Sequence, residues 1–209
     1  MNREELVETV TKAVLEHFQQ RTEVPVGIAN RHVHLSPDDL VRLSGEKVQL
    51  TKWKDLSQPG QYACEEKVVL VGPKGIIEQV RVLGPTRAKT QVEVSVTDCF
   101  KLGVIPEIRQ SGDLEGTPGI VLVGKLGAVT LKEGCIVAAR HLHVSSEEAK
   151  RYGLKDKDKI SVQSHGLRSV VFHNVLVRVH DNYRLELHLD FDEANGACLR
   201  QGDLLEIIR

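Results

Sequence analysis

Two histidine pairs are the residues of this sequence with the clearest chemical potential. Arg-His-Val-His-Leu-Ser occupies residues 31–36, and Arg-His-Leu-His-Val-Ser recurs at residues 140–145, each followed by acidic residues. Alternate side chains of a β-strand project from one face, so the two imidazoles of each pair would lie close together. Imidazole nitrogen is a common zinc ligand. The repeat therefore predicts an internal duplication with one metal site in each half.

A polar residue in a later strand of each half could complete each site. Glu93 stands between valines in the first half, and His188 stands between leucines in the second. Catalytic zinc takes three protein ligands and keeps a fourth position open, and no cysteine is part of either motif, which favours catalytic over structural sites. The predicted ligand sets are His32, His34 and Glu93 in the first half, and His141, His143 and His188 in the second.

A single His-x-His pair is also a common feature of protein cores and surfaces that bind no metal. Two such pairs have no reason to recur in the same frame with the same arginine and serine flanks, so the duplication favours the metal interpretation. The other histidines lack a partner motif and are expected at the surface. They are His17, His165, His173 and His180.

A second polar cluster is predicted around Glu93. Gly-Pro-Thr-Arg ends at Arg87, whose guanidinium could clamp a phosphate or carboxylate beside the metals, although an arginine in a turn is often only solvated. Gln91 shares a strand face with Glu93 and could support that ligand or donate to substrate. Residues 109–119 form a glycine-rich loop in which Ser111 and backbone amides could bind an anion. A plain connector between the halves is the alternative interpretation of this loop.

Short apolar runs bounded by glycine predict the elements that position these residues. They are typical of β-strands and, with 17 glycines, indicate small barrels, so the expected fold class is mainly β with short α-helices. Ser-Pro-Asp-Asp at 36–39 and Ser-Ser-Glu-Glu at 145–148 are typical helix starts. Residues 3–19 repeat apolar side chains at spacings of three and four, which predicts an amphipathic helix, and a turn before Pro25 separates it from the rest.

Composition excludes several functional classes. The chain has 28 Lys+Arg against 29 Asp+Glu and only 4% aromatic residues, which argues against a nucleic-acid partner. No apolar run approaches ~18 residues, and the N-terminus does not resemble a signal peptide, so we expect a cytoplasmic protein without a membrane partner. The four cysteines are far apart without a Cys-x-x-Cys pair and are expected to be small buried apolar residues. They are Cys64, Cys99, Cys135 and Cys198.

Ordered motifs from about residue 24 to the C-terminus resemble the PduL-type phosphotransacylases, the phosphate propanoyltransferases of bacterial microcompartments and of some acetate-forming pathways. The motifs that carry this resemblance are Asn-Arg-His-Val-His-Leu-Ser at 30–36, Gln-Pro-Gly-Gln-Tyr-Ala at 58–63, Leu-Gly-Pro-Thr-Arg at 83–87, Gln-Val-Glu at 91–93, Ser-Gly-Asp-Leu-Glu-Gly-Thr-Pro-Gly at 111–119, Ala-Arg-His-Leu-His at 139–143 and Asp-Glu-Ala-Asn at 192–195.

The resemblance implies a fold and a domain organisation. It implies two small β-barrel domains capped by short helices, with the active site between them and the strand before the first His-x-His joining the C-terminal half. Residues 21–30 plus 139–209 would form one barrel, residues 31–138 the other, and residues 1–20 a separate helix.

The resemblance also implies an enzyme that reversibly transfers a short acyl group, propanoyl in the family's name, between coenzyme A and inorganic phosphate. Two zinc ions per chain would be held by the two ligand sets given above. The phosphate-site arginine of the family falls on Arg87, and Ser111 matches a family serine. In this hypothesis phosphate, oriented by Arg87, attacks the thioester carbonyl to give acyl phosphate without a side-chain nucleophile. Gln91 is expected to assist substrate binding.

Alternatives from other classes stay open at this point. A metal-dependent thioester hydrolase would also use such a centre, because a bound metal activates water. A non-enzymatic zinc-binding assembly protein of a microcompartment is a third possibility. The helix at residues 1–20 is interpreted as an encapsulation peptide that binds shell or cargo proteins of a propanediol-degrading microcompartment. Packing on its own barrel, or on a second subunit of a homo-oligomer, is the alternative for this helix.

Overall fold

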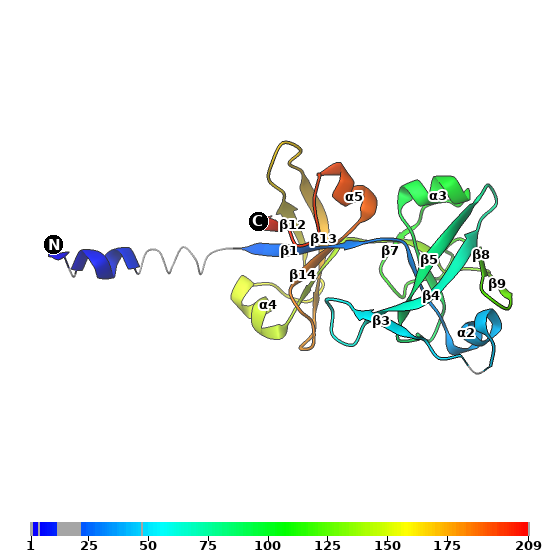
Figure 1. Cartoon of the computed structure of the whole chain (residues 1–209). Helices are drawn as coiled ribbons and strands as arrows, with labels where there is room; N and C mark the ends of the chain where they lie inside the picture. Colours follow the sequence, from blue (N-terminus) through cyan, green and yellow to red (C-terminus); the bar gives the residue numbers. More distant parts are fainter. Residues whose placement is uncertain (1, 4, 12–21, 47, 209) are drawn as a thin grey trace.

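The computed structural model describes residues 2–3, 5–11, 22–46 and 48–208 and shows two β structures side by side (Figure 1). Short helices connect the strands, so the predicted mainly β class is confirmed. Residues 5–11 are helical, with Leu6, Val7 and Val10 exposed. Much of the helix predicted over 3–19, together with His17, lies outside the described residues. No helix among the described residues is long and apolar enough to cross a membrane.

The C-terminal half forms a closed six-stranded barrel. The strand order is β1-β14-β11-β13-β12-β15, and antiparallel pairing of β15 with β1 closes the ring. Alternate side chains point inward, and those of Val24, Leu142 and Leu187 are fully buried in the barrel core. The strands are β1 (Glu23–Ala29), β11 (His141–Val144), β12 (Lys159–Gln163), β13 (Val171–Val179), β14 (Glu186–Asp190) and β15 (Leu204–Ile208).

The N-terminal half forms a nine-stranded sheet that curls but stays open. Its order is β7-β10-β6-β2-β5-β4-β8-β9, with β3 paired to β4. A hydrogen bond from the Cys135 amide to the Pro118 carbonyl joins the start of β10 to the residues before β8. The strands are β2 (His32–His34), β3 (Lys52–Asp55), β4 (Tyr62–Val71), β5 (Ile76–Gly84), β6 (Gln91–Glu93), β7 (Ile108–Arg109), β8 (Ile120–Val123), β9 (Ala128–Leu131) and β10 (Cys135–Ala138).

The two halves exchange the strands that precede their histidine pairs. β1 runs into β2 along the chain but pairs with β14 in the barrel, as the crossing strand in Figure 1 shows. β10 runs into β11 but pairs with β6 in the open sheet. Each histidine pair therefore begins where the chain passes from one half to the other, which places both pairs at the boundary between the halves.

In the described residues from 22 onward, four short helices begin at capping residues. Ser36 accepts a hydrogen bond from the Asp39 amide, and Ser145 accepts one from the Glu148 amide, as the sequence predicts. Two further helices follow the strands β6 and β14, and both begin with a capping box. The helices are α2 (Pro37–Ser44), α3 (Val96–Leu102), α4 (Ser146–Tyr152) and α5 (Phe191–Gly196).

The repeated arginine of the two motifs has a structural role. Arg31 forms a bidentate ion pair with Asp98, the capping-box residue of α3, at 2.8 Å. Arg140 makes the equivalent contact with Glu193, the capping-box residue of α5, at 2.7 Å. Each arginine thus fixes the start of the histidine strand against the helix that follows the third-ligand strand.

Three of the four cysteines are buried as predicted, and one is not. Cys64, Cys99 and Cys135 lie in the core of the open sheet. The expectation for Cys198 was wrong because this residue is exposed. It lies in the turn that follows α5, where its φ is 55°.

Candidate functional site

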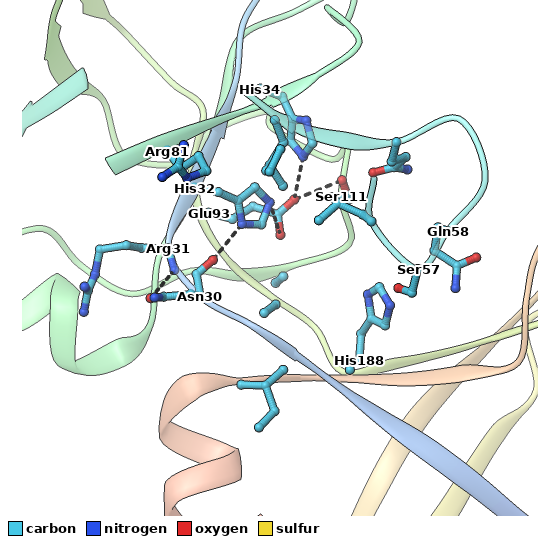
Figure 2. Close-up of a pocket in the computed structure, with 18 of the residues that line it drawn as sticks. Asn30, Arg31, His32, His34, Ser57, Gln58, Arg81, Glu93, Ser111 and His188 are labelled. Atoms are coloured by element: carbon cyan, nitrogen blue, oxygen red, sulfur yellow. Dashed lines mark hydrogen bonds and ion pairs between the residues drawn. The ribbon is translucent and has the colours of Figure 1, made fainter. Parts of the chain in front are cut away.

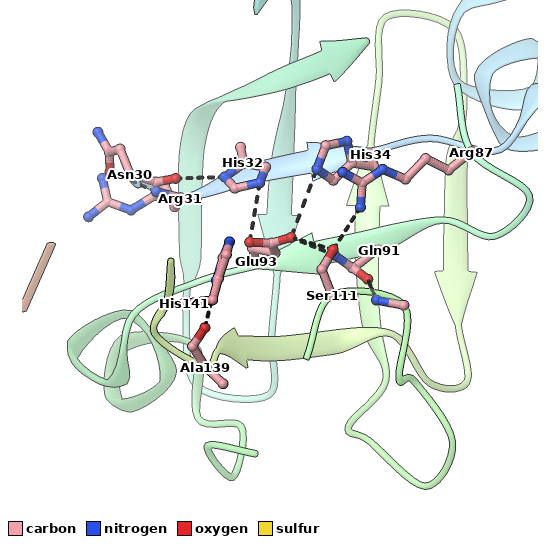
Figure 3. A network of polar contacts seen from close by, with 11 residues as sticks. Asn30, Arg31, His32, His34, Arg87, Gln91, Glu93, Ser111, Ala139 and His141 are labelled. Atoms are coloured by element: carbon pink, nitrogen blue, oxygen red, sulfur yellow. Dashed lines mark hydrogen bonds and ion pairs between the residues drawn. The ribbon is translucent and has the colours of Figure 1, made fainter. Parts of the chain in front are cut away.

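The first histidine cluster lies where β2 pairs with β6. In the antiparallel register His32 stands directly opposite Glu93. The His32 Nε2 lies 3.4 Å from Glu93 Oε2, and the His34 Nε2 lies 3.8 Å from Glu93 Oε1. One ligand atom from each of the three residues lies within 4.8 Å of the others (Figure 3). The structure therefore brings together the three residues of the first predicted ligand set.

The second cluster repeats this arrangement where β11 pairs with β14. His141 stands directly opposite His188 in the antiparallel register. The ring centroids of His141, His143 and His188 are 4.7–4.9 Å apart, and one ligand atom from each lies within 4.8 Å of the others. The second predicted set is therefore also assembled, and the equal pairing of β2 with β6 and of β11 with β14 reflects the duplication.

Hydrogen bonds to the ring nitrogens show that both clusters fit a metal. The Nδ1 atoms of His32 and His141 donate to the carbonyls of Asn30 and Ala139 at 2.8 and 2.9 Å, which leaves Nε2 free to coordinate. The Nδ1 atoms of His34 and His143 are buried and have no hydrogen-bond partner among the described residues. Buried polar atoms are rarely left unpaired. Imidazole, alone or with carboxylate, is a zinc donor set.

Burial keeps several of these imidazoles neutral, the form that binds metals. It lowers the pKa of His34 to about 3, with help from the charges of His32 and Arg87. It also lowers the pKa of His141 to about 4 and of His143 to about 2, and neighbouring imidazoles add to both shifts.

Glu93 and His32 support each other's charge. Burial opposes the charge on Glu93, but the charge of His32 and its hydrogen bond, together with His34 and Arg87, outweigh it and hold the pKa of Glu93 well below its usual range. Burial also opposes protonation of His32, yet the charge of Glu93 raises the pKa of this histidine above its usual value. Glu93 is therefore an anionic oxygen donor at neutral pH.

A polar network joins the other predicted site residues to Glu93 (Figure 3). The Arg87 Nη1 donates to Ser111 Oγ at 2.8 Å. The Gln91 Nε2 donates to Glu93 Oε1 at 2.5 Å and to Ser111 Oγ at 2.9 Å, and the Gly112 amide donates to Gln91 Oε1 at 2.7 Å. The glycine-rich loop thus reaches the first cluster instead of only joining the halves. Gln91 is only 1% exposed, and the substrate-binding roles expected of Gln91 and Ser111 stay predictions.

Several residues of the site were not identified from the sequence. Arg178 on β13 lines the cavity of the site and stands opposite His143 in the pairing of β11 with β13. The Tyr183 ring lies 4.3 Å from the His143 ring. Glu186 accepts a hydrogen bond from His188 Nε2 at 2.6 Å. Only Glu186 carries a sequence signal, because it precedes His188 by two residues as Gln91 precedes Glu93.

Both clusters open into one cavity of about 970 Å³ between the halves. Figure 2 shows residues of the first cluster in this pocket together with His188 of the second. Arg87, Arg178 and Ser111 line the same cavity. Farther along its wall Trp53 and Arg81 stack, with the guanidinium carbon 4.3 Å from the ring centroid, next to Lys54. A cavity of this size with several cations can hold a large anionic ligand.

Comparison with known proteins identifies a family to which the chain is similar. A family model described as phosphate propanoyltransferase matches residues 25–200. The chain is similar to the phosphate propanoyltransferase of Thermotoga maritima, with 52% identity covering 94% of each chain. It is similar to those of Rhodopseudomonas palustris, with 47% identity over 90% of this chain and 83% of the relative, and of Clostridioides difficile, with 43% identity over 99% of each.

Proposed function

The chain belongs to the phosphate propanoyltransferase family, and we propose that it reversibly transfers a short acyl group, propanoyl in the first instance, between coenzyme A and inorganic phosphate at two zinc ions. That it is a phosphate acyltransferase follows from the family. The proposal concerns the metals, coenzyme A and the acyl group.

The observation that carries this proposal is the convergence of two three-ligand clusters and Arg87 on one cavity. His32, His34 and Glu93 would hold one zinc, and His141, His143 and His188 the other. Bound zinc would polarise the thioester carbonyl and offset the charge of phosphate. The hydrogen bonds of His32 and His141 Nδ1 to backbone carbonyls, which leave each Nε2 available to a metal, support this donor set.

Arg87 is proposed to bind and orient phosphate. Its guanidinium contacts Ser111 through one nitrogen, and its fork of five donors leaves others for a phosphate oxygen pair. Arg178 adds a second positive charge on the opposite half. Held in this way, a phosphate oxygen attacks the thioester carbonyl, the C–S bond breaks, and the thiolate of coenzyme A leaves as acyl phosphate forms.

Direct transfer to phosphate fits the thiols of this chain. Burial raises the pKa of Cys64 and Cys99 to about 11, and of Cys135 to about 12, so these groups stay protonated and are poor nucleophiles. Cys198 is exposed and is not among the residues that line the cavity. The cations near Trp53 suit the phosphates of coenzyme A, and the ring offers a surface for its adenine.

The test is thiol release from propanoyl-CoA by the purified full chain, with and without inorganic phosphate. We expect release that requires phosphate and that yields propanoyl phosphate in equal amount. Release without phosphate would instead support the metal-dependent hydrolase, and no release from zinc-loaded protein would support the zinc-binding assembly protein.

The domain division and the cellular setting remain parts of the proposal. We assign residues 21–30 and 139–209 to one domain and 31–138 to the other. The exposed apolar residues Leu6, Val7 and Val10 support an interaction role for the N-terminal helix, such as binding of shell or cargo proteins inside a cytoplasmic microcompartment. Deleting residues 1–20 should leave a folded, active enzyme; a poorly folded product would favour packing of this helix on the enzyme itself.

A further inference from the structure

Glu186 is a buried carboxylate beside the second cluster that the proposed reaction does not use. It begins β14 and is 6% exposed. Its Oε2 lies 2.6 Å from His188 Nε2 and also accepts a hydrogen bond from Ser57 Oγ. Gln58 and Gln201 donate to the carboxylate at 3.5 and 3.4 Å. Glu186 is not part of the three-residue donor group formed by the histidines of this half, so it contacts a candidate ligand from outside the cluster.

Two of the partners of Glu186, Ser57 and Gln58, come from the other half of the molecule. Ser57 and Gln58 belong to the loop at residues 56–61, which joins β3 to β4 of the open sheet. The Gln58 side chain donates to the Arg184 carbonyl at 3.0 Å and accepts from the Arg184 amide at 3.2 Å. Figure 2 shows Ser57 and Gln58 next to His188. The loop is therefore docked on the start of β14 through four hydrogen bonds, of which one is buried and three are partly buried.

Close packing leaves the Glu186 side chain little freedom. A Cβ atom at Gly27 of β1 would lie 2.6 Å from the Glu186 carboxyl carbon, so this side chain occupies the space beside the glycine. Ser57 and Gln58 of the loop contact its carboxylate. A side chain held in this way can fix the orientation of the imidazole that bonds to it.

The first half holds its third ligand in the same way but with the opposite polarity. Gln91 precedes Glu93 by two residues and donates to its carboxylate, and Ser111 also donates to Glu93. Glu186 precedes His188 by two residues and accepts from it, and here the serine, Ser57, donates to Glu186 instead of to the ligand. A carboxylate ligand is thus paired with an amide donor, and an imidazole ligand is paired with a carboxylate acceptor.

We propose that Glu186 is a positioning residue that orients His188 for metal binding, and that the docked loop at residues 56–61 sets the metal affinity of the second site through it. The inference rests on the two-zinc function proposed above. With Nε2–H donating to Glu186, His188 offers Nδ1 to the metal, whereas His141 offers Nε2. A carboxylate behind a metal-bound imidazole raises the basicity of that ligand and fixes its tautomer. Each zinc would then have one carboxylate, Glu93 directly and Glu186 through His188.

Zinc affinity tests this inference without relying on activity. The full chain, loaded with zinc, is titrated against a chromophoric chelator, and the two dissociation constants are compared between wild type and Glu186→Gln. Losing an outer carboxylate typically weakens a metal site about 10–100-fold, so we expect one of two equivalents to weaken by that factor and the other to stay unchanged. The matched control is Glu78→Gln, an exposed carboxylate of the same cavity, which should keep both constants.

The two possible failures of this titration are distinguishable. A wild type that binds fewer than two zinc ions would overturn the proposed two-zinc function. A wild type with two tight sites and a Glu186→Gln variant with the same two constants would overturn the role of Glu186 alone.

Ser57→Ala covers the case in which Glu186→Gln does not fold. It removes one donor to Glu186 from a loop without a candidate ligand, and we expect the same zinc equivalent to weaken, by a smaller factor of a few. Wild-type affinity in this variant would contradict the role of the loop. As an independent readout, ¹⁵N spectra of histidine-labelled zinc protein should show His188 bound through Nδ1. Binding through Nε2 would contradict the orientation that Glu186 is proposed to impose.

Discussion

Strands β6 and β14 occupy equivalent positions in the two halves, yet the chemistry around them differs. Each pairs antiparallel with the histidine strand of its own half and parallel with the strand that precedes the histidine pair of the other half. Glu93 and His188 stand opposite the first histidine in each case. The residues two positions earlier differ accordingly: the amide of Gln91 donates to the carboxylate Glu93, and the carboxylate Glu186 accepts from the imidazole of His188. The two halves therefore place the third ligand at the same position, while the ligand and the residue two positions before it differ together.

The surroundings of the two clusters differ as well. Around Glu93 the network leads to Arg87 and to the glycine-rich loop, so the first site is directly connected to the proposed phosphate position. Around His188 the network leads to the loop at residues 56–61, so the second site is connected to the contact between the halves. We infer that a defect in the first site disturbs phosphate binding, whereas a defect in the second does not.

The largest expected effect comes from removing each third ligand in turn. Glu93→Ala and His188→Ala should each lose one zinc and lower turnover at least ~10³-fold, because several kcal/mol of electrostatic stabilisation go with the metal. Only Glu93→Ala should also raise the KM for phosphate, since Arg87 loses its network. Steady-state kinetics with phosphate varied, at saturating zinc, separate the two. An equal rise of the phosphate KM in both variants would contradict the inference that only the first site is linked to phosphate binding.

Arg87→Ala should keep both zinc ions and lose most activity. Removing one preorganised donor to a charged transition state typically costs about 10²–10³-fold in turnover. The measurement is phosphate-dependent thiol release together with metal content. Arg168→Ala, an exposed arginine elsewhere in the barrel half, serves as the control and should be fully active. Near-normal turnover of Arg87→Ala would exclude Arg87 from the phosphate site.

The metal-free barrel should lose stability in mild acid through His141. In the unfolded chain this histidine binds a proton near pH 6.5, but in the folded protein its lowered pKa keeps it neutral down to about 4. The unfolded state therefore binds more protons as pH falls through this window, and the free energy of unfolding falls with it. From pH 7 to pH 5 we expect a loss of about 1–2 kcal/mol from this group.

Urea unfolding of metal-free wild type and His141→Gln at the two pH values measures this contribution. Between pH 7 and pH 5 the free energy of unfolding of the variant should fall by about 1–2 kcal/mol less than that of wild type, because glutamine does not titrate. Parallel pH dependence in the two proteins would mean that His141 is not held neutral by its burial. His32 is expected to behave differently, since Glu93 raises its pKa.

Effects on stability, without loss of a metal ligand, are expected at the repeated arginines. Arg31 binds Asp98 through two contacts, and the Asp98 side chain is 5% exposed, whereas Glu193 opposite Arg140 is 19% exposed. An unpaired charge costs more where water reaches it less, so Arg31→Ala should destabilise by about 1–3 kcal/mol and Arg140→Ala by about 1 kcal/mol. Chemical denaturation of the two variants gives the comparison. A larger loss from Arg140→Ala would contradict the burial argument.

Local patterns in the sequence were enough to predict much of the candidate site. The Arg-His-x-His repeat predicted two clusters, and strand alternation placed Gln91 beside Glu93, because these relationships involve residues close in sequence. The helix starts at Ser36 and Ser145 were predictable for the same reason. Strand alternation could not show which of these residues bind substrate, so the roles of Arg87, Gln91 and Ser111 still rest on the proposed function.

Features that depend on distant residues could not be predicted from these patterns. Ser57 reaches Glu186 across 129 positions of the chain, and nothing in either local sequence indicates that contact. Closure of one sheet and opening of the other depends on which edge strands meet in space. Arg178 faces the site only because β13 pairs with β11 in one register, with Arg178 opposite His143.

Metal content per chain tests the central claim, that the two motifs build two separate metal sites, most directly. Wild type, His32→Ala and His141→Ala are loaded with zinc, freed of excess metal and analysed by mass spectrometry for zinc per chain. We predict two zinc ions in wild type and one in each variant. One zinc in wild type that disappears in both variants would instead show a single shared site and contradict the account.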